Sequence, residues 1–171
     1  MIVLGIGSNL KSNFGNRFMN IDIAISYLEQ YGIKLLKKSS YYESLSYPDS
    51  SKPKFINVII EVSTSLPPED LASVLIYIEE KLERKRSQKN EPRTCDIDII
   101  DYKQMIVKNK IILPHSRMHI RNFVLLPLFE ITKTWIHPLK KVTIKDLVNS
   151  LKTEELRAIK LIWINVIMFN A

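Results

Sequence analysis

The sequence contains a single cysteine, Cys95, so it has no internal disulfide. This shortage is typical of proteins in a reducing compartment, and we expect a cytoplasmic location. Only four glycines occur among 171 residues, and no apolar stretch reaches the roughly 18 residues of a membrane span. The first residues, 1–5, carry no basic segment, and we expect them to form a strand rather than a signal peptide. We therefore expect no membrane association.

Acidic residues are in the minority, since 25 lysines and arginines face 18 aspartates and glutamates, and the net charge is +7. A basic excess favours an anionic partner such as nucleic acid, a membrane surface or a phosphate ligand, unless the lysines are simply solvated surface. The composition, 46% hydrophobic and 25% charged, is globular and excludes disorder and collagen. The length favours one domain spanning residues 1–171.

The first hundred residues alternate between strand and helix patterns. Apolar residues repeat at helical spacing from Phe14 to Leu28 and again from Leu71 to Leu82, whereas residues 55–62 alternate as a strand. The expected elements are strand 2–6, helix 14–28, strand 33–43, loop 44–54, strand 55–62, helix 67–82, loop 84–93 and strand 94–102. This order, β-α-β-β-α-β, is that of a ferredoxin-like α+β fold with helices packed on one face of an antiparallel sheet.

The remaining residues, 103–171, form a C-terminal extension. We expect a hairpin near 105–113 and short helices near 123–130 and 144–151. The tail 152–171 matches no pattern that we can assign.

Asp96 and Asp98 are the sharpest chemical signal in the sequence. They are two positions apart on an expected strand, so both carboxylates project from the same face. Two carboxylates this close repel each other unless a cation lies between them, and Mg²⁺ is commonly held by one or two carboxylates together with substrate phosphates. We expect these acids to bind metal rather than to be exposed strand acids. Because removing either acid relieves the repulsion, we expect the fold to survive their replacement.

Basic residues cluster on both sides of this pair. The cluster consists of Arg84, Lys85, Arg86, Lys89 and Arg93 before it, and His115 and Arg121 after it. Arginines neutralise phosphate oxygens well, so a metal-bound polyphosphate would explain both the acids and the bases. For Lys85 and Lys89, a solvated charge run is an equally good explanation.

Other candidate motifs carry less weight. His115 and His119 have zinc-ligand spacing, but Ser116 stands where the zincin pattern requires glutamate. Gly5 and Gly7 lack the rest of a phosphate-binding loop, so we expect a structural turn there. Phe55 and Asn57 share the strand face opposite the expected core, where an aromatic ring and an amide suit a flat heterocycle.

Together these residues resemble the 6-hydroxymethyl-7,8-dihydropterin pyrophosphokinase family of folate biosynthesis. The similarity spans roughly residues 1–150. Its segments are Gly7-Ser8-Asn9-Leu10, Ser39-Ser40-Tyr41-Tyr42-Glu43-Ser44, Phe55-Ile56-Asn57, Glu79 with Arg84 and Arg86, Pro92-Arg93-Thr94-Cys95-Asp96-Ile97-Asp98-Ile99, Pro114-His115, Arg121-Asn122-Phe123 and Pro127-Leu128-Phe129-Glu130.

The resemblance implies an ATP-dependent diphosphotransferase that converts the pterin hydroxymethyl group to its diphosphate and releases AMP. It implies that Asp96 and Asp98 bind two Mg²⁺ ions and, with Arg84 and Arg93, form the catalytic centre. The implied ATP-binding residues are Glu79, Arg84, Arg86, Arg93, His115 and Arg121. The implied pterin-binding residues are Ser44, Tyr47, Phe55, Asn57 and Phe123.

Some positions depart from the family pattern. Asn90 and Glu91 stand where the family often has tryptophan, Ile76 replaces a polar contact, and Leu45 replaces a proline. We expect a monomer that acts on ATP and the pterin and binds no nucleic acid. Two alternatives are a metal-dependent phosphodiesterase, which would hydrolyse rather than transfer, and a non-catalytic RNA-binding ferredoxin-like domain. Residues 55–62 lack the aromatic pattern that the RNA-binding alternative requires.

Overall fold

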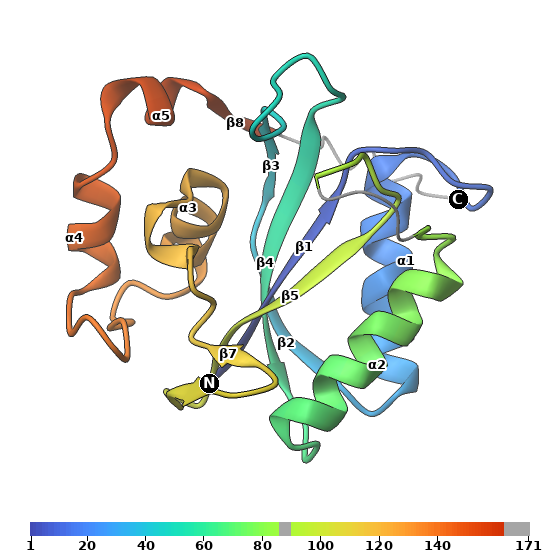
Figure 1. Cartoon of the computed structure of the whole chain (residues 1–171), viewed down its shortest axis with the longest axis horizontal. Helices are drawn as coiled ribbons and strands as arrows, with labels where there is room; N and C mark the ends of the chain where they lie inside the picture. The colour runs from blue at the N-terminus through green and yellow to red at the C-terminus, as the bar shows by residue number, and fades with distance from the viewer. Residues whose placement is uncertain (86–89, 163–171) are drawn as a thin grey trace, which may run out of the picture.

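The fold is known from a computed structural model, which describes residues 1–85 and 90–162. In this part of the chain, six strands form one antiparallel sheet in the order β5-β1-β4-β3-β8, with β2 also pairing with β4 (Figure 1). The strands are β1 (Ile2–Ser8), β2 (Lys34–Lys38), β3 (Tyr41–Ser44), β4 (Phe55–Ser63), β5 (Asp96–Tyr102) and β8 (Ile159–Ile162). The expected α+β class with an antiparallel sheet is confirmed.

One face of the sheet is covered by α1 (Arg17–Gln30) and α2 (Pro68–Lys81). The side chain of Asn16 accepts the backbone N–H groups of Phe18 and Met19, and this cap fixes the start of α1. Pro68 and two acidic residues in the first turn of α2 favour its start. The apolar stripes of both helices pack on Ile56, Val58, Ile60 and Val62 of β4, as the alternation in residues 55–62 predicts.

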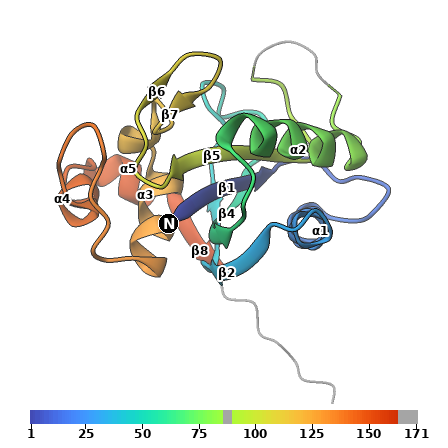
Figure 2. The same cartoon turned by 90° about the horizontal axis from the view of Figure 1, so that it is seen from below.

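The opposite face is covered as well, which the sequence did not indicate. There α3 (Asn122–Ile131) and α4 (Ile144–Asn149) form a second core with Val3, Ile59 and Ile100, so the sheet lies between two helical layers (Figure 2). The expectation of helices on one face therefore holds only for α1 and α2. Both faces of β4 and β5 carry isoleucines, so both need apolar cover.

The sheet edge near β3 differs from the expectation in two ways. The expected strand 33–43 is interrupted at Ser39 and Ser40, giving β2 and β3, which both pair with β4. The unassigned tail supplies α5 (Thr153–Arg157) and then β8, which pairs with β3 from Tyr41 to Ser44. Residues 163–171 lie outside the described residues. The tail thus covers an otherwise open edge of β3.

Smaller elements link β5 to α3. The expected hairpin is present as β6 (Val107–Lys108) and β7 (Ile112–Leu113), and a 3₁₀ turn, η1 (Met118–Ile120), precedes α3. No helix in the described ranges 1–85 and 90–162 is long and apolar enough to cross a membrane.

The second core is tied to the sheet through the buried carboxylate of Asp101. This carboxylate accepts the indole N–H of Trp135 at 2.8 Å and the backbone and side-chain N–H groups of Gln104 at 3.1 and 2.7 Å. Because Asp101 is fully buried, loss of any one donor leaves part of its carboxylate without a hydrogen bond.

We expect Trp135→Phe to lower the free energy of unfolding by roughly 1–3 kcal/mol, since the ring is kept but the donor to Asp101 is lost. Urea unfolding measures this effect. Asp101→Asn combined with Trp135→Phe should be less destabilising than the sum of the single changes. If the two changes in free energy of unfolding were additive, the hydrogen bond between Trp135 and Asp101 would not join the second core to the sheet.

Candidate active site

The site lies where β1, β4 and β5 run side by side. Gly7 of β1 is paired with Asn57 on one side and Asp96 on the other. A Cβ atom on Gly7 would lie 3.2 Å from Asn57 Oδ1 and 3.4 Å from the Phe55 ring. The lack of a side chain there leaves a hollow between the amide and the carboxylate. Gly5 and Gly7 therefore belong to a strand that floors the site, and the expected structural turn was wrong.

A first cavity, which we call the Phe55 cavity, opens above this floor. It contains all five residues that the sequence assigned to pterin binding, namely Ser44, Tyr47, Phe55, Asn57 and Phe123. Its charged lining consists of Arg93, Asp96, Asp98, Arg117 and Arg121. These side chains come from β3, β4, β5 and α3 and from the segments beside them, so residues far apart in sequence meet at one cavity.

A second cavity, the Glu79 cavity, lies on the α2 side of the same two aspartates. Its polar lining consists of Glu79, Arg84, Asp96, Asp98 and His115. The rest is apolar: Ala72, Leu75, Ile76, Ile97, Ile99, Ile111, Ile112 and Leu113. Asp96 and Asp98 are shared by both cavities, so they stand at the boundary between two binding spaces.

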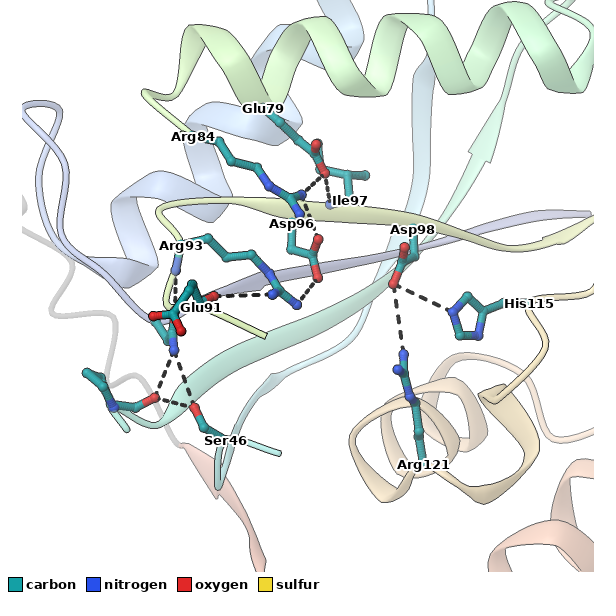
Figure 3. A network of polar contacts seen from close by, with 12 residues as sticks. Ser46, Glu79, Arg84, Glu91, Arg93, Asp96, Ile97, Asp98, His115 and Arg121 are labelled. Atoms are coloured by element: carbon teal, nitrogen blue, oxygen red, sulfur yellow. Dashed lines mark hydrogen bonds and ion pairs between the residues drawn. The ribbon is translucent and has the colours of Figure 1, made fainter. Parts of the chain in front are cut away.

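Asp96 is fully engaged by arginines. Its Oδ1 atom accepts from Arg84 Nη1 and its Oδ2 atom from Arg93 Nη2, both at 2.6 Å (Figure 3). Arg84 also donates to Glu79 Oε1, which in turn accepts the backbone N–H of Ile97 at 2.7 Å. Glu79 is only 3% exposed, so this network links α2 firmly to the start of β5.

Asp98 has a different environment. Among the described residues, the side-chain nitrogens that face it are His115 Nε2 at 3.9 Å and Arg121 Nη1 at 4.0 Å, which is too far for hydrogen bonds (Figure 3). Removal of water by the walls of the site, and then the charge of Asp96, raise the pKa of Asp98 to about 6, although 43% of its side chain is exposed. The two acids therefore differ, because Asp96 is neutralised by arginines whereas Asp98 has no close partner in residues 1–85 and 90–162.

His115 is neutral at physiological pH. Burial and the charges of Arg121 and Arg117 lower its pKa to about 4. Its Nδ1 atom accepts the backbone N–H of Arg117 at 3.3 Å, so the ring proton resides on Nε2, which faces Asp98. His115 can therefore donate one hydrogen bond into the site.

The walls of the Phe55 cavity pair aromatic rings with arginines. The guanidinium of Arg93 lies 5.1 Å from the centre of the Phe55 ring, and that of Arg121 lies 5.3 Å from the Phe123 ring. Between them, Asn57 Nδ2 donates to Ser44 Oγ at 3.0 Å and to the Tyr42 carbonyl at 3.3 Å. Since that carbonyl can only accept, the amide nitrogen is fixed in place and Oδ1 faces the cavity as an acceptor.

The donor set at the boundary suits Mg²⁺. Two carboxylates on one strand face supply hard oxygen ligands, and phosphate oxygens usually complete such sites. The described residues contain no group of three or more His, Cys, Asp or Glu side chains arranged to hold a metal by themselves. Each oxygen of Asp96 accepts one arginine N–H and keeps a further lone pair for a cation, while Arg84 and Arg93 can turn to another anion. A polyphosphate offers that anion.

Comparison with known proteins identifies the family. The model of the 7,8-dihydro-6-hydroxymethylpterin-pyrophosphokinase (HPPK) family matches residues 3–133. The chain belongs to the HPPK family. The family assignment made from the sequence is confirmed, and with it the enzyme class, a pyrophosphokinase of folate biosynthesis.

The relatives differ in length. A 2-amino-4-hydroxy-6-hydroxymethyldihydropteridine pyrophosphokinase from Aquifex aeolicus is 34% identical, over 85% of this chain and 88% of that protein. The folic acid synthesis protein fol1 of Pneumocystis carinii is 39% identical over 80% of this chain, which spans only 18% of that protein. The Plasmodium falciparum HPPK-DHPS structure shares the fold, with a TM-score of 0.76 at 16% identity, over 95% of this chain and 47% of that one.

The structure adds an HPPK-site residue that the sequence reasoning missed. Asn9 is buried, and its Oδ1 atom accepts the backbone N–H of Arg93 at 2.7 Å, while its Nδ2 donates to the Pro53 carbonyl at 3.0 Å. It therefore ties the loop that follows β3 to the segment carrying Arg93. The sequence shows Asn9 only as part of the family motif Gly7-Ser8-Asn9-Leu10. It does not show that Asn9 is buried, so its role in joining the two segments could not be predicted. Arg86, which the resemblance assigned to ATP binding, lies outside the described residues, as does Lys89.

The stability of the apo protein should separate the two acids, contrary to the expectation that both behave alike. The raised pKa of Asp98 means that its ionisation disfavours the folded state. The penalty is absent below the usual pKa near 3.8 and complete above pH 6. Asp98→Asn should therefore raise the melting temperature at pH 8, and the gain should vanish near pH 4.

Asp96→Asn is the matched comparison. It weakens two arginine ion pairs, so it should lower the free energy of unfolding by roughly 1–3 kcal/mol at pH 8. Thermal unfolding in EDTA without nucleotide measures both variants. A drop in stability for Asp98→Asn at pH 8 would contradict the assigned environment of Asp98.

Proposed function

We propose that this chain transfers diphosphate from ATP to the hydroxymethyl group of 6-hydroxymethyl-7,8-dihydropterin. The products are AMP and the pterin diphosphate. The observation that carries this proposal is the position of Asp96 and Asp98 between two cavities, one lined by aromatic rings and an amide and the other largely apolar. A reaction that joins two small molecules across bound phosphates needs this arrangement.

The transfer is a displacement at the β-phosphorus of ATP. The hydroxymethyl oxygen forms a bond to this phosphorus, and the bond between it and the oxygen bridging to the α-phosphorus breaks. That oxygen leaves with AMP, and the hydroxyl proton passes to solvent. Mg²⁺ held by Asp96 and Asp98 would neutralise phosphate charge when bound, and we propose two ions, as in the family resemblance.

The side chains that can donate hydrogen bonds to phosphate fall into two groups, one in each cavity. Arg84 and His115 line the Glu79 cavity, whereas Arg93 and Arg121 line the Phe55 cavity. We assign the Glu79 cavity to ATP. Its apolar lining, which includes Ile76, would contact the adenine base. Arg84 and the Nε2–H of His115 would donate to phosphate oxygens. Arg93 and Arg121 then meet the transferring group from the other side. Catalysis on this arrangement rests on positioning and electrostatics rather than on a strong base.

The Phe55 cavity takes the pterin. Phe55 and Phe123 offer ring faces for stacking. Asn57 Nδ2 donates to Ser44 and to the Tyr42 carbonyl, which leaves Oδ1 as an acceptor for a ring or amino N–H. Tyr47 lies at the rim of the cavity and is 76% exposed, so its side chain encloses little of the cavity in the free protein. A heterocycle with N–H donors on one edge suits this cavity better than an aliphatic substrate does.

We propose that residues 2–102 follow the ferredoxin-like order, with β2 and β3 together taking the place of the second strand. We also propose that the chain acts as a single catalytic domain, as a monomer in the cytoplasm. A phosphodiesterase built on the same two acids would hydrolyse without the pterin, so dependence on the pterin is the discriminating observation.

The wild-type chain with Mg²⁺ should form AMP from ATP only when hydroxymethyldihydropterin is present. Asp96→Ala and Asp98→Ala should each lower turnover by at least about a hundredfold, since a charge that stabilises the transferring group is worth several kcal/mol. Chromatographic quantification of AMP measures this. AMP formed at the same rate without the pterin would point to hydrolysis instead.

Asn57→Ala should weaken the pterin far more than the nucleotide. Loss of the acceptor for a substrate N–H should cost roughly 1–3 kcal/mol, about fivefold to 150-fold in affinity. Calorimetric titration with the pterin and with a non-hydrolysable ATP analogue separates the two. Asn20→Ala is the control, because Asn20 is also buried and hydrogen-bonded but lines neither cavity. Equal losses for both ligands would contradict the placement of Asn57.

A further inference from the structure

Arg117 is a charged residue of the site that belongs to none of the family motifs and has no role in the reaction proposed above. It lies between His115 and the turn η1 and lines the Phe55 cavity together with Arg93 and Arg121. It does not line the Glu79 cavity. Its position is therefore on the side where the acceptor binds.

The side chain of Arg117 has no partner among the described residues. Its backbone N–H donates to His115, but its guanidinium makes no hydrogen bond or ion pair with residues 1–85 or 90–162. By contrast, Arg93 pairs with Asp96 at 2.6 Å, and Arg121 faces Asp98 at 4.0 Å. Within the part of the chain that the structure describes, Arg117 is thus a cation without a partner at the Phe55 cavity.

Its charge acts on the neighbouring site residues. Arg117 and Arg121 both line the Phe55 cavity. Like charges that line one cavity repel one another. An anion bound between Arg117 and Arg121 would remove that repulsion.

We propose that Arg117 binds the diphosphate after its transfer, as part of a product subsite on the pterin side. The inference rests on the proposed function and adds a residue to it. Before transfer, the phosphates belong to ATP and lie toward the Glu79 cavity. After transfer, the diphosphate is attached to the pterin, and Arg117 is the arginine lining the Phe55 cavity that has no partner among residues 1–85 and 90–162. The ligand class is a diphosphate ester of a flat heterocycle.

This placement predicts a selective effect. Arg117→Gln should weaken the pterin diphosphate by about fivefold to tenfold, the lower range for a charge-assisted contact, because the side chain is exposed. Affinity for hydroxymethyldihydropterin, which has no phosphate, should stay within about twofold of wild type. Arg117→Lys should retain part of the affinity, since it keeps the charge but loses the fork geometry.

The experiment is calorimetric titration of the full chain with Mg²⁺ and three ligands: the pterin diphosphate, hydroxymethyldihydropterin and a non-hydrolysable ATP analogue. Arg157→Gln is the matched control, because Arg157 is an exposed arginine on α5 that lines neither cavity. Product inhibition of AMP formation provides a second readout, with a higher inhibition constant expected for Arg117→Gln.

Selective loss of product affinity in Arg117→Gln, with partial rescue in Arg117→Lys, supports the subsite. Unchanged product affinity in an active enzyme overturns the role of Arg117 and leaves the proposed function standing. An equal loss for all three ligands also overturns it, since the effect would then be general. A wild-type chain that forms no pterin-dependent AMP overturns the proposed function, and the product subsite with it.

Discussion

The site depends on two carboxylates that share one face of β5. Their separation is fixed by the strand, so the chain must manage their repulsion by other means. It does so unequally. Asp96 is neutralised by Arg84 and Arg93, whereas Asp98 lies 4.0 Å from Arg121 and 3.9 Å from the neutral His115 and has a raised pKa. The apo site is therefore balanced by internal arginines that a metal-bound polyphosphate can recruit.

A missing side chain shapes the space above these acids. Gly7 stands between Asn57 and Asp96 in the sheet, and any larger residue would meet the amide and the Phe55 ring. The hollow lets a flat ligand lie close to the strands while its reacting group reaches the carboxylates. The glycine and the two acids are thus parts of one constraint, which is set by the register of three neighbouring strands.

The loops around the site are held from the floor of the cavity. Asn9, at the end of β1, bonds to the backbone of Arg93 and of Pro53, and Lys52 pairs with Glu91 at 2.8 Å. The segments that border the Phe55 cavity are therefore joined to each other and to the sheet. This fixes the backbone of Arg93 while its side chain stays able to exchange partners.

The sequence by itself determined the class of fold, the family and most of the residues that meet at the site. These follow from local rules: strand alternation placed Asp96 and Asp98 on one face, and the spacing of motifs such as Pro92-Arg93 with Asp96 identified the family. Of the two cores, the sequence indicated only the one under α1 and α2, because α3 and α4 pack against the other face of the sheet through contacts distant in sequence. Tertiary structure alone decided which arginine neutralises which acid, where Gly7 leaves space in the floor of the site and that Arg117 has no partner among the described residues. Pairing across β1, β4 and β5 is non-local, and the period of a single strand cannot encode it.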